Sequence, residues 1–221
     1  MYPDKLKEII ISGESSTVEF KRKISSYEKI AREISAFANT IGGYLIIGVD
    51  DDGKIVGIES EKSSSDQIEE ICGFYIDPPI EPEIEIVNIS NKDVIVVYIN
   101  ESNKKPHRIN DNGSNSEYES RAYIRVGDKS LIASREMERV LAGLSPDSKP
   151  LKLSIGDKEK RLFAFLEKNE KATVKDFARI VNISERRASR LLVRLVRAGV
   201  LQIHVDNNSD FFTLVEKIDG Q

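Results

Sequence analysis

The chain has 221 residues, of which 39% are hydrophobic and 32% are charged, so it is long enough for two domains with buried cores and densely charged surfaces. Its single cysteine, Cys72, excludes an intrachain disulfide framework and a multi-cysteine zinc site. The first ten residues are charged from Asp4 onward, and no apolar run approaches the length of a membrane span. We therefore expect a cytoplasmic protein without a signal peptide and without a membrane partner.

The net charge of −4 is divided unevenly along the chain. Residues 1–146 hold 18 Lys and Arg against 26 Asp and Glu, whereas residues 147–221 hold 15 against 11. The first part therefore carries −8 and the second +4. The change falls near "GLSPDSKP" (143–150), which is rich in Gly, Pro and Ser and has no hydrophobic period. These features predict a first domain at 1–144, a linker at 145–155 and a second domain at 156–221.

Helices and strands alternate in the first domain, which indicates a mixed α/β layer within an α+β protein. Hydrophobic periods and turn residues predict, in chain order, a helix at 4–13 ended by Gly13, a strand at 17–24, a helix at 27–43, two strands around a "DDDG" turn at 44–58, a helix at 63–76, a hairpin at 83–100 turning at Ser90-Asn91, a strand at 121–128 and a closing helix at 134–144. The Asn-, Gly- and Ser-rich stretch at 110–120 is typical of a mobile loop.

The second domain has a simpler pattern. Amphipathic periods predict helices at 157–169, 173–181 and 184–199, with Thr173 and Ser184 as N-caps and Gly199 as the stop. Apolar alternation on both sides of "DNNSD" (206–210) predicts a hairpin. Three helices followed by a hairpin are the plan of a winged helix-turn-helix domain.

Arginines follow one line along the third of these helices. Arg187, Arg190, Arg194 and Arg197 recur at spacings of three, four and three, so we expect one exposed stripe with Arg186 beside it. Arginine at this density suits contacts to phosphates and guanine edges. A solvated basic face, a dimer contact or a protein–protein module are the other interpretations, and the weak net charge of the domain keeps them open.

Four blocks occur in order in the first domain: "ESSTVEFKRK" (14–23), "AREISAFANTIGGYLIIGVDDDGKIVGI" (31–58), "KPHRIN" (105–110) and "AYIRVGDKSLIASREME" (122–138). Together they resemble the Schlafen AlbA_2 domain family over about residues 14–144. The resemblance implies an AlbA_2-type domain, here followed by the winged helix, as in prokaryotic family members described as transcriptional regulators.

In Schlafen relatives with nuclease activity, three carboxylates cut tRNA and rRNA with a divalent metal. The resemblance places these carboxylates at Glu14, Glu19 and Asp50, with Asp51 as the alternative to Asp50. Hard oxygen ligands suit Mg²⁺ or Mn²⁺, and such an ion polarises a scissile phosphate. Lys21 shares a strand face with Glu19 and would stabilise charge on that phosphate. Alternatively, Glu14 is a polar residue on the surface beyond a helix end, and the aspartates serve only the turn.

Basic side chains of the first domain are expected to contact nucleic acid, although a solvated surface would explain them equally well. They are Arg22, Lys23, Lys104, Lys105, Arg108 and Arg125, with Arg121 in the wider group. His107 is better explained as structural or phosphate-adjacent than as a general base, because nothing in the sequence orients it. ATP binding through a P-loop is not expected, because the stretch "IGGYLIIG" lacks the Gly-Lys-Ser/Thr of that motif. Its two glycines are better explained as a helix stop before a buried strand.

Two departures from the nuclease-type relatives bear on function. Those proteins carry two such lobes that form a clamp and a His/Cys zinc site, whereas this chain has one lobe and one cysteine. A homodimer would rebuild the clamp. Two functions stay open: a metal-dependent endoribonuclease acting on structured RNA such as tRNA, or a non-catalytic DNA-binding transcriptional regulator whose first domain dimerises or contacts nucleic acid.

Overall fold

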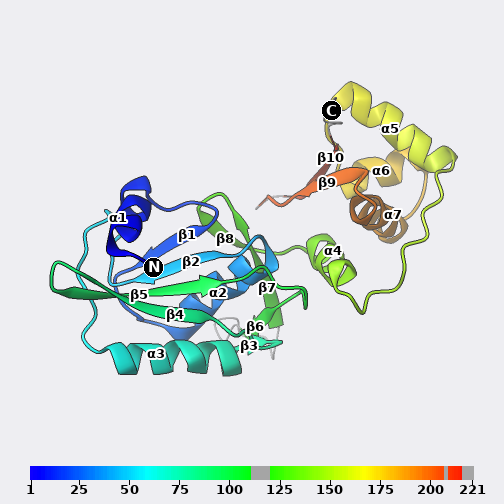
Figure 1. Cartoon of the computed structure of the whole chain (residues 1–221). Helices are drawn as coiled ribbons and strands as arrows, with labels where there is room; N and C mark the ends of the chain where they lie inside the picture. Colours follow the sequence, from blue (N-terminus) through cyan, green and yellow to red (C-terminus); the bar gives the residue numbers. More distant parts are fainter. Residues whose placement is uncertain (111–119, 207–208, 216–221) are drawn as a thin grey trace. The chain divides into compact units, whose positions relative to one another are not determined.

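The computed structural model describes residues 1–110, 120–206 and 209–215, and it divides the chain into two compact units, Met1–Ile132 and Ala133–Gln221 (Figure 1). This division differs from the expected boundary at residue 144. Helix α4 (Arg135–Leu144) belongs to the second unit, because Val140 on its apolar face packs into the core of that unit. Most of the loop expected at 110–120 lies outside the described residues.

The first unit is built on a four-stranded sheet with the order β1-β2-β5-β4. Its strands are β1 (Val18–Lys21), β2 (Gly43–Ile47), β5 (Lys92–Ile99) and β4 (Glu83–Ile89). The pair β1 and β2 is parallel, and the other pairs are antiparallel. Ser90 and Asn91 both have positive φ angles, 52° and 61°, at the β4–β5 turn. The predicted hairpin is therefore confirmed, and its turn has the left-handed backbone that a tight two-residue loop requires.

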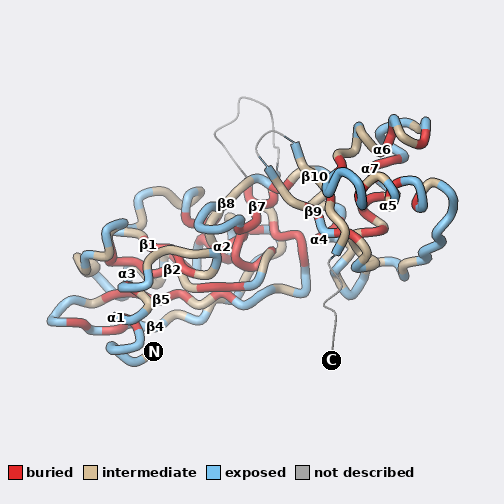
Figure 2. The backbone as a smooth tube through the Cα atoms, turned by 90° about the horizontal axis from the view of Figure 1, so that it is seen from above, coloured by how far each residue is buried: buried red, intermediate tan, exposed pale blue. Residues whose placement is uncertain are grey.

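Helices pack on both faces of this sheet, and its strands β1, β2 and β5 are largely buried, whereas most of the edge strand β4 is exposed (Figure 2). Successive residues of a strand point to opposite faces. Leu45 and Ile47 join one core with α2 (Tyr27–Asn39) and α3 (Glu61–Glu70), whereas Ile46 joins another with α1 (Pro3–Ser12). The hydrophobic run of the second strand, which alternation alone would not explain, is therefore buried on both sides.

A second, smaller sheet has the order β3-β6-β7-β8. Its strands are β3 (Ile76–Asp77), β6 (Arg108–Asn110), β7 (Ser120–Val126) and β8 (Lys129–Ile132). Asn39, at the end of α2, holds it in place. Its amide nitrogen donates to the carbonyls of His107 and Tyr123 at 2.8 and 2.9 Å, and its amide oxygen accepts from the His107 backbone nitrogen at 2.8 Å.

Two local expectations for the first unit are wrong. The strand predicted after the "DDDG" turn does not form, and residues 54–58 make only an isolated bridge between Val49 and Ile55. The Gly48 carbonyl accepts from the backbone nitrogens of Val56 and Gly57 instead, which turns the segment out of the sheet. The helix expected at 63–76 starts earlier, after the N-cap Ser60, and ends in a π-helical turn, η1 (Ile71–Tyr75).

The second unit contains the three helices and the hairpin that the sequence predicts, preceded by α4. They are α5 (Asp157–Asn169), α6 (Val174–Val181), α7 (Glu185–Arg197), β9 (Leu201–His204) and β10 (Phe211–Leu214). Phe177, Leu192 and Phe212 lie at 0% exposure in its core. Thr173 caps α6: its hydroxyl accepts from the Asp176 backbone nitrogen, and the Asp176 carboxylate accepts from the Thr173 nitrogen.

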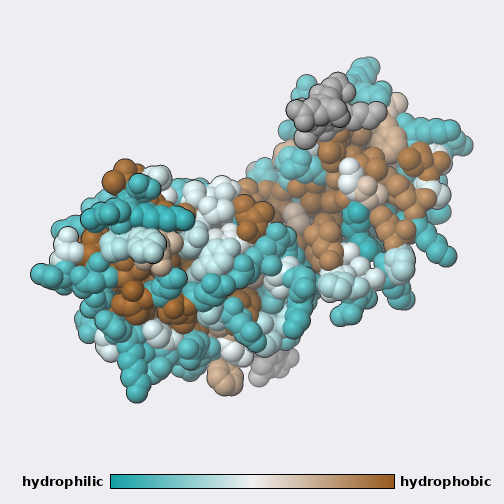
Figure 3. Space-filling model, viewed as in Figure 1, coloured by the Kyte–Doolittle hydropathy of each residue, from teal (hydrophilic) through white to brown (hydrophobic). Residues whose placement is uncertain are grey.

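On the face shown in Figure 3, the first unit is mainly hydrophilic with scattered hydrophobic residues, whereas hydrophobic residues gather over much of the second unit among hydrophilic ones. No helix in the part of the chain that the structure describes is both long and apolar enough to cross a membrane.

Candidate functional site

Cationic side chains gather at one groove of about 580 Å³ in the first unit. We call it the basic groove, and its lining comprises Lys21, Arg22, Lys23, Ser25, Lys29, Arg32, Glu33, Asp50, Asp51, Tyr123 and Ser130. The end of β1, the first turns of α2 and the loop after β2 bring these residues together. Five of them carry a positive charge and three a negative charge. The groove thus concentrates cations in the part of the chain that is acidic as a whole.

The basic groove includes two cations that the sequence analysis missed. Lys29 and Arg32 are three residues apart on α2, so they share one face of the helix, away from the buried Ile30 and Ile34. The Arg32 guanidinium lies over the Tyr123 ring, 5.6 Å from its centroid. The polar face of this amphipathic helix was the available signal, but only the fold shows that it adjoins the cations at 21–23.

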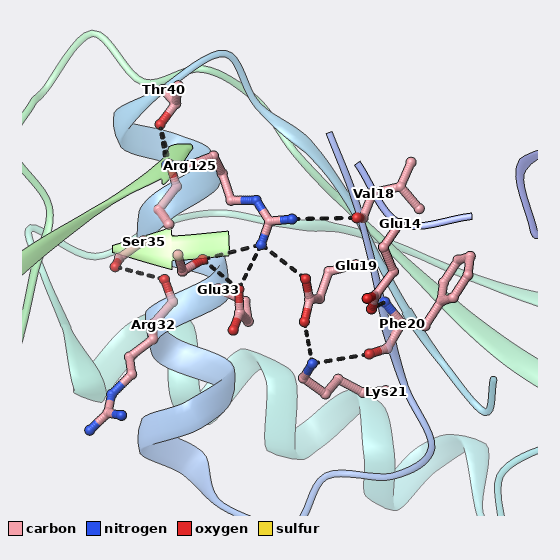
Figure 4. Close-up of polar contacts among 12 residues, drawn as sticks. Glu14, Val18, Glu19, Phe20, Lys21, Arg32, Glu33, Ser35, Thr40 and Arg125 are labelled. Atoms are coloured by element: carbon pink, nitrogen blue, oxygen red, sulfur yellow. Dashed lines mark hydrogen bonds and ion pairs between the residues drawn. The ribbon is translucent and has the colours of Figure 1, made fainter. Parts of the chain in front are cut away.

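A buried arginine organises the acidic side of the groove (Figure 4). The Arg125 side chain is fully buried, and its Nη1 donates to Glu19 Oε2 and Glu33 Oε2, each at 2.9 Å. Its Nη2 donates to the Ser15 carbonyl at 2.7 Å. We expected Arg125 to contact nucleic acid, and this expectation is corrected: its buried guanidinium forms ion pairs with two carboxylates inside the protein.

Glu19 has a cation on each of its oxygens. Oε2 accepts from Arg125, and Oε1 accepts from the Lys21 ammonium, which also donates to the Phe20 carbonyl at 3.1 Å. The Glu19 residue is 6% exposed. Lys21 therefore stands beside Glu19 as predicted, and it binds this carboxylate directly.

Two further carboxylates have perturbed acidities. Burial raises the pKa of Glu33, and the neighbouring charge of Glu19 raises it further. Burial likewise raises the pKa of Glu14, with added repulsion from Glu19 and Asp51, although Glu14 Oε1 accepts from the Phe20 nitrogen at 2.9 Å. The positive charge of Lys21 opposes both shifts, so the pKa values of Glu14 and Glu33 are raised less than they would be without it. Several carboxylates thus act on one another around a single ammonium group.

Asp50 belongs to the turn after β2 and to the edge of the basic groove. Its Oδ2 accepts from Arg22 Nη1 at 2.7 Å, and its carbonyl accepts from the Gly53 nitrogen at 2.8 Å. Asp50 therefore stabilises the turn after β2, which was the simpler explanation for an aspartate at this position. Asp51 is exposed and also lines the groove.

The side chains of the predicted metal ligands are not arranged as a metal site in the structure. Among residues 1–110, 120–206 and 209–215, no group of three or more His, Cys, Asp and Glu side chains is placed to hold a metal ion. Glu19 is held by two cations, Glu14 by a backbone nitrogen and Asp50 by Arg22. The Mg²⁺ or Mn²⁺ ion expected from the resemblance stays a prediction.

The cations of the "KPHRIN" block do not line the basic groove. The Lys105 side chain is buried, and its ammonium donates to Glu101 and to the Thr40 carbonyl, so its predicted role in nucleic-acid contact is corrected to a structural one. His107 is buried with Nδ1 2.7 Å from the Pro78 carbonyl oxygen, and burial lowers its pKa. Lys104 is exposed, and Arg108 is half-buried on β6.

The arginines of α7 separate into two groups rather than one exposed stripe. Arg186, Arg187 and Arg190 are exposed. Arg194 donates to the Lys152 carbonyl, and Arg197 donates to the Lys149 carbonyl at 3.2 Å. The first group is available to a ligand, whereas the second holds the segment that follows α4.

Comparison with known proteins places the first unit in a family. Residues 14–134 match the family described as Schlafen, AlbA_2. The N-terminal domain of a RecG-related protein from Nitrosomonas europaea is 25% identical over 59% of this chain and 92% of that one, with a TM-score of 0.47. The DIP2311 protein from Corynebacterium diphtheriae is 17% identical, with a TM-score of 0.50, and shows the fold alone.

That similarity covers 96% of this chain, which spans 38% of the length of the Corynebacterium protein. The match of residues 14–134 is the stronger finding, because it covers more than half of the chain and contains β1, the "GVDDDG" turn and the Arg125 strand. The chain belongs to the Schlafen AlbA_2 family.

Proposed function

We propose that the protein binds nucleic acid, with the sugar–phosphate backbone lying in the basic groove of the first unit. The observation that carries this proposal is the gathering of five Lys and Arg side chains at one groove of an otherwise acidic unit. Neutralisation of backbone phosphates by such side chains supplies most of the affinity in non-specific nucleic-acid binding. Membership of the Schlafen AlbA_2 family supports a function related to nucleic acid.

The acidic residues give the groove two different sides. Lys29 and Arg32 present cations from α2, and these suit phosphate oxygens. Glu33 and Asp51 would repel phosphates, and they suit hydroxyl and amino groups of sugars and bases. A single strand, whose sugars and base edges are accessible, meets both requirements better than a regular duplex.

Fluorescence anisotropy with a labelled single-stranded RNA tests this proposal. The double variant Lys29→Ala/Arg32→Ala is expected to weaken binding and to reduce the slope of log Kobs against log salt by about 1.4, that is, by about 0.7 for each lost phosphate contact. The matched control Lys5→Ala/Lys7→Ala removes two exposed cations of α1 and should leave both quantities unchanged. Equal binding by the groove variant and the control would contradict the proposal.

A finer prediction concerns cleavage of structured RNA such as tRNA. The repulsion that Glu19 and Asp51 exert on Glu14, beside Lys21, favours it, because carboxylates crowded at one place attract cations. The engaged state of Glu19 and Asp50 does not favour it. Nucleic-acid binding is therefore the function that the geometry supports best, and metal-dependent endoribonuclease activity is tested separately.

The second unit supports another candidate function, DNA binding in a transcriptional regulator. We propose that α5–α7 with β9 and β10 form a winged helix-turn-helix in which Arg186, Arg187 and Arg190 face the DNA. An Arg187→Ala/Arg190→Ala variant should bind duplex DNA more weakly than the wild type. The control Lys158→Ala/Lys160→Ala removes two cations of α5 instead. Equal DNA binding by both variants would contradict this candidate.

Homodimerisation is a further proposal, made because a second copy would supply the missing lobe of the clamp. Light scattering coupled to size-exclusion chromatography is expected to give the mass of two chains, about 50 kDa from 24.9 kDa each. A mass of one chain at both low and high loading would contradict it.

A further inference from the structure

A second cavity of about 580 Å³ adjoins the basic groove, because Arg22 and Lys23 line both. We call it the serine pocket, and its lining comprises Arg22, Lys23, Ile24, Ile47, Val56, Gly57, Ile58, Glu59, Ser60, Ser63, Ser64 and Gln67. Its size lies within the range of small-ligand sites, which is about 300–1,000 Å³. The end of β1, the segment after the "DDDG" turn and the first turns of α3 form its walls.

One side of the serine pocket is polar. Ser63, Ser64 and Gln67 come from α3, and Glu59 from the segment just before it. The Ser60 hydroxyl is engaged, since it accepts from the Ser63 backbone nitrogen at 3.3 Å. The other two hydroxyls and the Gln67 amide can each donate and accept hydrogen bonds, whereas Glu59 accepts only.

The other side is aliphatic. Ile47 is buried, and Ile24, Val56 and Ile58 are half-buried, so part of their apolar surface faces the pocket. Backbone hydrogen bonds hold this wall: Val56 and Gly57 donate to the Gly48 carbonyl at 2.8 and 2.9 Å, and Ile58 donates to the Asp93 carbonyl at 2.9 Å. A held apolar wall opposite a few polar groups is the usual composition of a preformed small-molecule site.

We propose that the serine pocket binds one nucleoside phosphate unit. Its phosphate lies on Arg22 and Lys23 and accepts from the Ser63 and Ser64 hydroxyls. The Glu59 carboxylate accepts hydrogen bonds from ribose hydroxyls. The base lies against Ile24, Val56 and Ile58, and the Gln67 amide pairs with its edge.

This inference rests on the proposed function, because the nucleotide in the serine pocket would belong to the nucleic-acid strand that lies in the basic groove. A backbone that lies in the basic groove reaches Arg22 and Lys23 at one end, and the next nucleotide along then enters the serine pocket. The same chemistry would also hold a free mononucleotide. The test must therefore separate a nucleotide that belongs to a strand from one that is free.

Titration with the four 5′-mononucleotides and with an eight-nucleotide RNA separates these sources, using the wild type and two double variants. Glu59→Ala/Gln67→Ala changes the serine pocket, and Lys62→Ala/Asp66→Ala is its control on exposed positions of α3 that do not line the pocket. We expect the pocket variant to bind the RNA at least about tenfold more weakly than the control does, since it loses the hydrogen bonds of Glu59 to the ribose and of Gln67 to the base edge.

The outcomes distinguish this inference from the proposed function. Mononucleotide binding that is lost in Glu59→Ala/Gln67→Ala but kept in Lys29→Ala/Arg32→Ala supports the serine pocket, even where RNA fails to bind the groove. RNA binding without mononucleotide binding supports it only where the pocket variant weakens the RNA. Equal RNA binding by the pocket variant and its control overturns the inference and leaves the groove proposal standing. Failure of both ligands to bind the wild type overturns both.

Discussion

Arg125 on β7 and Glu19 on β1 form a buried ion pair, with 2.9 Å between Nη1 and Oε2. The Arg125 side chain is 0% exposed and the Glu19 side chain 8%. The two residues lie 106 positions apart in the chain and belong to different sheets of the first unit. The pair therefore joins the small sheet to the large one and sets the position of a carboxylate that the family resemblance singles out.

Removal of the arginine should destabilise the first unit strongly. Arg125→Ala leaves Glu19 and Glu33 buried without their shared partner, and loss of one member of a buried pair costs about 3–5 kcal/mol. Urea unfolding followed by tyrosine fluorescence measures this, because the chain has no tryptophan and all seven tyrosines lie in residues 1–132.

The control for Arg125→Ala is Arg22→Ala, which breaks the exposed pair with Asp50 and should cost less than about 1 kcal/mol. A loss below about 1 kcal/mol for Arg125→Ala as well would show that the buried pair contributes little to folding.

Glu33 should make the stability of the first unit depend on pH. Burial and the Glu19 charge raise its pKa above the ordinary value of 4.5, so the folded protein holds this proton more tightly than the unfolded chain. Its contribution to stability is therefore fully present below pH 4.5 and is lost as the pH rises through the folded-state pKa.

Glu33→Gln removes this titration. The free energy of unfolding of the wild type minus that of Glu33→Gln should fall as the pH rises above 4.5 and become constant above the folded-state pKa. Urea unfolding at several pH values provides the comparison. A difference that increases with pH would contradict the assigned direction.

The cap of α6 should stabilise the second unit. Thr173→Ala removes the hydroxyl that binds the Asp176 backbone nitrogen and carboxylate, at a cost of about 1 kcal/mol, whereas Thr173→Ser keeps the hydroxyl and serves as the control. Hydrogen exchange of the α6 amides measures the loss. Equal protection in Thr173→Ala and Thr173→Ser would contradict the role of the cap.

The same cap predicts a pH dependence of opposite sign to that of Glu33. Hydrogen bonds from Thr173 lower the pKa of Asp176 below its ordinary value of 3.8. Its contribution to stability is therefore present above pH 3.8 and is lost as the pH falls through the folded-state pKa. In Thr173→Ala this acid loss should be smaller than in the wild type.

Metal-dependent cleavage has a direct test with labelled tRNA. The prediction requires cutting with Mn²⁺ or Mg²⁺, intact RNA with EDTA, and a rate at least about tenfold lower in Glu14→Gln. Glu8→Gln, on an exposed position of α1, is the control. Intact tRNA in the presence of either metal would contradict the nuclease, and RNA that still binds would leave the basic groove as the functional site.

Local patterns predicted most of the elements. The β4–β5 hairpin follows from alternation around Ser90-Asn91, and α6 follows from the Thr173 cap and its hydrophobic period. The strand predicted at 54–58 does not form, because its residues make other contacts. Ile58 packs against the core of α2 and α3, and Val56 and Gly57 donate to Gly48. Alternation alone does not separate such a segment from a strand.

The sequence by itself determined the family blocks, most of the helices and strands, and the placement of Lys21 beside Glu19, because these depend on residues close together in the chain. Only the tertiary structure decided which charges meet. Arg125 is buried against Glu19 and Glu33, Lys29 and Arg32 complete the basic groove, and Arg194 and Arg197 hold the linker segment. A charged side chain looks the same in sequence whether it faces solvent or a buried partner. Burial and pairing depend on contacts between distant segments, which local periodicity does not encode.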